Sequence, residues 1–153
     1  MQSLSERSVA LAAVGVVMAI ATVTDLRERR VPLWLTLGGI AGGLAVAALG
    51  GVERLVQAAI GLVVGGLLLA PFIVVGLVRG EEGVGIGDAL LLAVVGTWLG
   101  WPFVLSTAWW GSLAGGVLAL VALLRKQRAF PYVPALAIGA VGAAFLPLGI
   151  GRG

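Results

Sequence analysis

The sequence predicts an all-α integral membrane protein, a bundle of about six transmembrane helices. Of its 153 residues, 60% are hydrophobic and only 11% are charged, whereas a soluble domain needs roughly a quarter of its residues charged to cover its surface. The mean hydropathy is +1.13. One span takes about 20 apolar residues, so about six spans use most of the chain. We therefore expect residues 1–153 to form a single membrane domain.

The expected helices follow apolar runs that are separated by charged or proline-containing breaks. The first run ends before Asp25; Ala19-Ile20-Ala21 loosely resembles a signal-peptide cleavage site, but the run is long for a signal peptide, and we expect it to remain as a helix. Trp101-Pro102 separates the fourth run from the fifth, and a basic segment that ends at Pro131 precedes the last. The runs are residues 8–24, 33–50, 55–78, 88–100, 102–124 and 132–150.

Glycines spaced by four residues recur within these runs. This spacing allows helix backbones to approach each other closely in lipid, so we interpret it as a packing signal. The pairs are Gly38/Gly42, Gly39/Gly43, Gly61/Gly65 and Gly111/Gly115.

The basic residues predict the orientation, because cytoplasmic loops carry an excess of Lys and Arg. Seven of the ten lie in the breaks after the first, third and fifth runs, and three lie on the opposite side. We therefore expect a multi-pass inner or plasma membrane protein with both termini outside. The seven are Arg27, Arg29, Arg30, Arg79, Arg125, Lys126 and Arg128, and the three are Arg7, Arg54 and Arg152.

The composition excludes several kinds of chemistry. The chain has no Cys and no His, which removes disulfides, thiolate zinc sites, cysteine nucleophiles and Ser-His pairs. Lys126 is the only lysine. The net charge of +3 is scattered over short loops, so we expect no nucleic-acid partner. No metal or other cofactor is expected.

The two aspartates of the chain are the candidate catalytic residues. We expect Asp25 to end the first helix and Asp88 to open the fourth, so two spans separate them and both should lie on the same, cytoplasmic side. Carboxylates near the membrane interior are costly and indicate function by default. Two converging carboxylates can hydrolyse a peptide without metal, because they share one proton: one activates water and the other polarises the carbonyl.

Each aspartate also has a purely structural interpretation. Asp88 follows Gly85-Ile86-Gly87 and precedes an apolar run, as a helix N-cap would. Asp25 could instead pair with Arg29, four residues later, although such an exposed pair gains only a few tenths of a kcal/mol. The glycines at 85 and 87 permit non-helical backbone and close approach of an extended peptide, so we predict that they contact substrate.

Three motifs in this order resemble the type IV prepilin peptidases. Asp25-Leu26-Arg27-Glu28-Arg29-Arg30-Val31-Pro32 is similar to their first-aspartate motif, and Gly85-Ile86-Gly87-Asp88 to their GxGD motif. The segment from Pro131 to Ala140 resembles the start of their final helix. Leu33 and Leu90 depart from the family pattern, which often has Asn and Lys there.

The resemblance implies an intramembrane aspartic endopeptidase with Asp25 and Asp88 as its pair. Its substrates would be type IV pilin-like precursors, cut between a basic leader and an apolar helix. Larger members carry a four-cysteine region and also N-methylate the product, so this cysteine-free chain resembles the short form that only cleaves, and methyltransferase activity is not expected. Glu81 and Glu82, just before the GxGD motif, are predicted to bind the basic leader.

Two other functions remain open at this point. The chain could be a noncatalytic assembly protein derived from a peptidase. It could also be a small proton- or cation-coupled transporter that uses Asp88 at a broken helix. The near absence of polar residues in most of the runs speaks against transport.

Overall fold

The computed structural model describes residues 4–28, 30–79, 85–125, 132–146 and 148. Within these ranges all regular structure is helical, which confirms the all-α prediction. The helices are α1 (Leu4–Glu28), α2 (Leu33–Leu49), α3 (Val52–Leu68), α4 (Ala70–Arg79), α5 (Ile86–Leu99), α6 (Trp101–Leu124) and α7 (Val133–Phe145). Helices α3 and α4 follow each other directly, so the described helices correspond to the six predicted apolar runs.

Three segments are long and apolar enough to cross a membrane, namely Ser5–Glu28, Val52–Val75 and Trp101–Leu124. The apolar helices α2, α5 and α7 are shorter. Many large apolar side chains point outward on the long helices, such as Leu67 at 64% exposure and Val117 at 64%. Such outward apolar faces are expected where the surrounding solvent is lipid. The chain is thus a multi-pass membrane protein.

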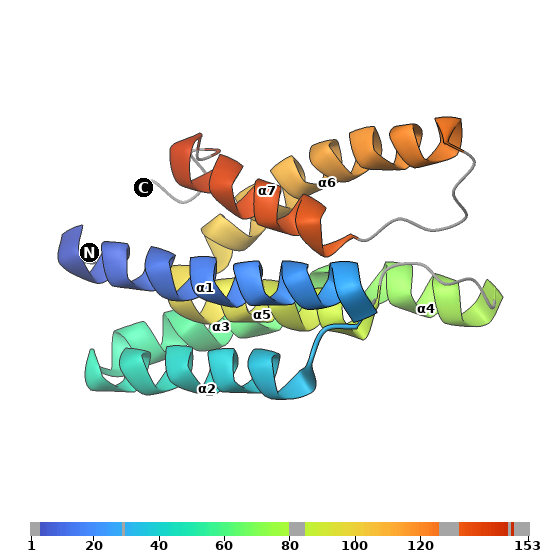
Figure 1. Cartoon of the computed structure of the whole chain (residues 1–153). Helices are drawn as coiled ribbons and strands as arrows, with labels where there is room; N and C mark the ends of the chain where they lie inside the picture. Colours follow the sequence, from blue (N-terminus) through green and yellow to red (C-terminus); the bar gives the residue numbers. More distant parts are fainter. Residues whose placement is uncertain (1–3, 29, 80–84, 126–131, 147, 149–153) are drawn as a thin grey trace.

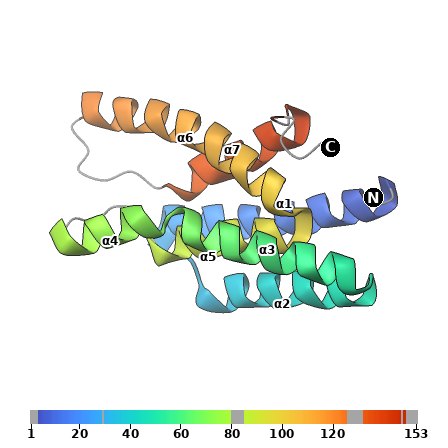
Figure 2. The same ribbon diagram turned by 180° about the vertical axis from the view of Figure 1, so that it is seen from behind.

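Helix α5 lies inside the bundle, although it is one of the short helices. It packs against α3, α2, α6 and α1, and Figures 1 and 2 show it enclosed by them. Its residues Leu91 to Thr97 are all buried. The chain enters and leaves the bundle at one end, which holds the start of α1 and the end of α7 (Figure 1).

Glycine contacts explain how α5 reaches this position. A Cβ atom added to Gly61 of α3 would overlap the backbone of Gly96 in α5, and one added to Gly65 would overlap the backbone of Leu92. Only glycine lets the two backbones come this close. The predicted packing role of the Gly61/Gly65 pair is therefore confirmed.

Two of the other glycine pairs contact side chains of neighbouring helices. On α2, Gly39 and Gly43 face Val94, Thr97 and Trp98 of α5, and the indole nitrogen of Trp98 donates a hydrogen bond of 2.8 Å to the Gly39 carbonyl.

The pair Gly111/Gly115 on α6 faces the first turn of α7. The remaining pair, Gly38/Gly42, contributes less to helix packing. A Cβ added to Gly42 would lie 3.3 Å from the Trp98 ring, and one added to Gly38 would meet nothing within 4 Å.

We predict that Gly61→Ala destabilises the protein strongly, because the added methyl group must push α3 away from α5. Overpacking of this kind costs roughly 1–3 kcal/mol. The matched control is Gly66→Ala in the same helix, where an added Cβ meets nothing within 4 Å. Since alanine favours helix by about 1 kcal/mol over glycine, the control should be neutral or stabilising. Thermal unfolding in detergent measures both; equal effects would contradict the packing account.

Candidate functional site

Asp25 lies at the start of the last turn of α1. The helix continues to Glu28, so the expectation that Asp25 ends the helix is wrong by about one turn. The residue is half-buried, and its Oδ2 atom is fully buried. Its alternative partner, Arg29, lies outside the described residues. Asp25 thus presents a carboxylate oxygen to the interior of the bundle.

Asp88 lies in the first turn of α5 and is only 7% exposed. The helix begins at Ile86, with Gly85 as the N-cap residue, so the N-cap interpretation of Asp88 itself is wrong. Asp88 occupies the third helical position, and its Oδ2 accepts a hydrogen bond of 2.9 Å from the Gly85 N–H. The Asp88 carboxylate therefore accepts a hydrogen bond from a backbone N–H that the helix itself leaves unpaired. Asp88 thus takes part in capping the helix and is also buried.

The short length of α5 leaves Asp88 recessed. The helix has 14 residues, about 21 Å at 1.5 Å per residue, against about 30 Å of hydrocarbon. The neighbouring α6 has 24 residues, about 36 Å by the same rise. Because α6 begins two residues after α5 ends, the first turn of α5 lies inward from the far end of α6.

The structure places the two aspartates within electrostatic range of each other. Helix α1 packs against α5, and the charges of Asp25 and Asp88 interact electrostatically. Figures 1 and 2 place the end of α1 and the start of α5 at the same end of the bundle, away from the chain termini. The prediction that both aspartates lie on one side agrees with this arrangement.

The residues around the GxGD motif have different environments. Gly87 packs against Val31 in the connection between α1 and α2, where an added Cβ would lie 2.9 Å from the Val31 Cβ. This contact links the segment after Asp25 to the helix start that carries Asp88. Gly85 is exposed and has room for a side chain. Glu81 and Glu82 lie outside the described residues, and the substrate contacts expected for these four residues stay predictions.

Tyr132 is a polar neighbour of Asp88 to which sequence reasoning assigned no role. It immediately precedes α7 and packs against the buried core. An added Cβ on Gly115 would lie 3.1 Å from its ring, so the ring rests on α6. Its hydroxyl interacts with the Ser112 side chain, and its electrostatic environment includes Asp88. The tyrosine lies inside the motif from Pro131 to Ala140, but only tertiary structure places it near Asp88.

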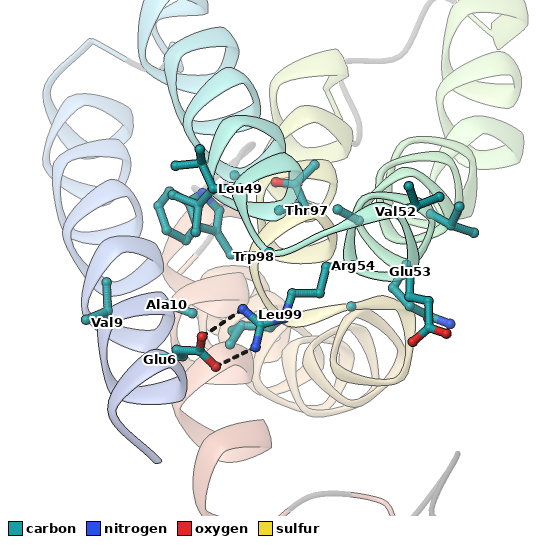
Figure 3. Close-up of a pocket in the computed structure, with 18 of the residues that line it drawn as sticks. Glu6, Val9, Ala10, Leu49, Val52, Glu53, Arg54, Thr97, Trp98 and Leu99 are labelled. Atoms are coloured by element: carbon teal, nitrogen blue, oxygen red, sulfur yellow. Dashed lines mark hydrogen bonds and ion pairs between the residues drawn. The ribbon is translucent and has the colours of Figure 1, made fainter. Parts of the chain in front are cut away.

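A pocket of about 1050 Å³ lies at the opposite end of the bundle, beside the chain termini. Figure 3 shows its lining from the start of α1, the turn between α2 and α3, and the end of α5. There Arg54 forms a bidentate ion pair with Glu6, with distances of 2.8 and 2.5 Å. This pair ties α1 to the α2–α3 hairpin. The residues that line the pocket include neither aspartate.

The two departures from the family pattern lie in different surroundings. Leu33 begins α2 and is 59% exposed, so most of its side chain faces outward. Leu90 follows Asp88 by two residues and is half-buried. Two residues correspond to about 200° of helix rotation, so Leu90 leaves α5 on nearly the opposite side from Asp88.

The chain is similar to known bacterial proteins over most of its length. Prepilin leader peptidase/N-methyltransferase of Burkholderia pseudomallei (strain 1026b) is 36% identical over 143 residues, which cover 89% of this chain and 46% of that protein. The protein of the same name from Aeromonas salmonicida (strain A449) is 37% identical over 127 residues, with coverage of 80% and 44%. The one from Escherichia coli (strain K12) is 37% identical over 127 residues, with coverage of 78% and 55%.

The chain thus spans about half the length of these curated relatives. No solved structure shows significant similarity to it. The model of the Type IV leader peptidase family matches residues 12–120, a range that contains both Asp25 and Asp88. With this match over more than half of its residues, and with the two aspartates brought together inside the matched range, the chain belongs to the type IV leader peptidase family.

Proposed function

We propose that this chain is a membrane-embedded aspartic endopeptidase that removes basic leader peptides from pilin-like precursors. One observation carries the proposal: Asp25 and Asp88, on two packed helices, interact at one end of the bundle, where Asp88 is almost fully buried. Family membership supports peptidase activity. The printed name of the relatives, prepilin leader peptidase/N-methyltransferase, supports the substrate class.

The pair performs hydrolysis by sharing one proton, because two adjacent negative charges repel each other. The ionised carboxylate takes a proton from water as the water oxygen attacks the carbonyl carbon of the scissile peptide. The protonated carboxyl gives its proton to the carbonyl oxygen, and a neutral tetrahedral diol forms. When the diol collapses, the first carboxyl protonates the amide nitrogen, the C–N bond breaks, and the diol returns a proton to the second carboxylate.

The recessed position of Asp88 suits a bond at the junction between a leader and an apolar helix. The apolar helix of the precursor stays in lipid, beside the outward apolar faces of the bundle. The leader stays in water at the end that carries the aspartates, which the excess of basic residues in its loops assigns to the cytoplasm. The scissile peptide then reaches the boundary where the aspartates lie.

Cleavage without methyl transfer is the activity we assign to these residues. In larger members of the family a four-cysteine region accompanies methylation, and these 153 residues contain no cysteine. The proposal therefore assigns methyl transfer to none of these 153 residues.

We predict that Asp25→Asn and Asp88→Asn each abolish cleavage, because an amide neither takes up the water proton nor donates one to the carbonyl oxygen. General acid–base catalysis contributes about 10²–10⁴-fold, so each variant should lose at least about a hundredfold in rate. The assay co-expresses a precursor with a short basic leader and an apolar helix of about 20 residues, and scores leader loss on a gel.

The matched control is Glu53→Gln, which makes the same carboxylate-to-amide change at the opposite end of the bundle. It should leave the rate unchanged, and all three variants should insert and unfold like the parent protein. Full-rate cleavage by either aspartate variant would refute the assignment of the pair. A parent protein that leaves such precursors uncut would refute the endopeptidase and favour the noncatalytic assembly role.

We predict that replacing Glu81 and Glu82 by Gln raises KM for a basic leader and leaves kcat nearly unchanged. The reason is that charge attraction raises the encounter rate without acting on the reacting atoms. The effect should shrink as salt increases, because exposed charges are screened beyond about 10 Å at 0.1 M ionic strength. The measurement compares a basic and a neutralised leader at low and high salt. Unchanged discrimination between the leaders would remove both glutamates from the site.

A further inference from the structure

Thr22 on α1 carries a buried hydroxyl that the fold leaves unused. Its Oγ1 is fully buried and has no hydrogen-bond partner among the groups that the structure describes. Hydroxyls in apolar helices normally bond to a carbonyl one turn earlier. Thr24, two residues later on the same helix, does so with the carbonyls of Ile20 and Ala21, at 3.1 and 2.9 Å. Thr36 and Thr97 likewise bond to carbonyls of their own helices.

An unpaired buried hydroxyl is costly, about 1–3 kcal/mol. Valine has nearly the same shape and avoids this cost, so the threonine is unfavourable for folding alone. Thr107 on α6 is the other threonine among the described residues with an unpartnered buried hydroxyl. It packs beside Gly139 in the contact between α6 and α7, close to the end of the bundle that holds the termini.

Thr22 shares the face of α1 that holds Asp25. Asp25 follows Thr22 by three positions, which corresponds to about 4.5 Å along the helix axis and about 60° around it. Val17 marks the flank that faces α2, because its side chain reaches Gly39. By helical rotation Asp25 lies about 80° from Val17, and Thr22 about 140° from it on the same side.

The neighbours of α1 identify what covers that flank. Helix α1 packs against α7, α5 and α2, and the flank away from α2 is covered by α5 and α7. Asp88 lies on α5, and Tyr132 immediately precedes α7. By its position on α1, Thr22 lies on this flank, about one turn deeper in the bundle than Asp25.

We propose that the Thr22 hydroxyl binds the attacking water and holds it beside Asp25. The inference rests on the proposed peptidase function. Buried waters typically make about three hydrogen bonds, and two carboxylates and a hydroxyl supply such a set. The hydroxyl accepts or donates one hydrogen bond and exchanges no proton with the substrate. In the apolar interior it fixes the direction of attack, which affects the transition state more than substrate binding.

The test compares Thr22→Val with Thr22→Ser in detergent, using the precursor with the short basic leader described above. The valine variant should lose about ten- to hundredfold in kcat, the range for one hydrogen bond to a reacting group, with KM nearly unchanged. The serine variant keeps the hydroxyl and should retain most of the rate. Thermal stability of the valine variant should equal or exceed that of the parent protein, because an unpaired hydroxyl has been removed.

Two control variants separate this role from a structural one. Thr24→Val changes the same helix, and Thr107→Val removes the other unpartnered hydroxyl; both should keep full kcat. A valine variant at Thr22 that cleaves at full rate, while Asp25→Asn is inactive, would overturn the water-binding role and leave the peptidase intact. A change in KM alone, or losses of rate and stability that match those of Thr24→Val, would also overturn it. A parent protein without cleavage would overturn both proposals.

Discussion

The close backbone contact between α3 and α5 is the constraint on which the other features depend. Lipid supplies little hydrophobic force between helices, so association relies on close packing, and small residues make it possible. Gly61 against Gly96, and Gly65 against Leu92, allow α5 to sit within the bundle instead of at its margin. Helices α1, α2 and α6 then pack around α5, and the short length of α5 places Asp88 inward from the far end of α6.

This packing also determines the chemistry available at the site. In a low-dielectric interior an unpaired charge is expensive, which makes a single shared proton the favourable state for two neighbouring carboxylates. The Gly85 N–H gives Asp88 a fixed partner, and the contact of Gly87 with Val31 joins the two segments that carry the aspartates. The glycines of the GxGD motif thus have structural roles that are compatible with substrate approach.

Much of the fold follows from hydropathy, whereas the site depends on tertiary contacts. The six apolar runs predicted the helices because burial in lipid demands long uncharged segments. Helix ends were less predictable: α1 continues past Asp25 because an interfacial helix tolerates charge, and α5 begins at Ile86 because Gly85 caps it. The placement of Tyr132 and the unused hydroxyl of Thr22 depend on which helices become neighbours, and local sequence carries no such information.

The central claim is that Asp25 and Asp88 work as one pair that shares a proton. The most direct measurement is the pH dependence of kcat/KM for cleavage of a precursor with a basic leader and an apolar helix. The account predicts a bell-shaped profile, in which gain of one proton on the acid side and loss of one on the alkaline side each stop the reaction. A profile governed by a single ionisation, or one that stays level across both sides, would contradict it.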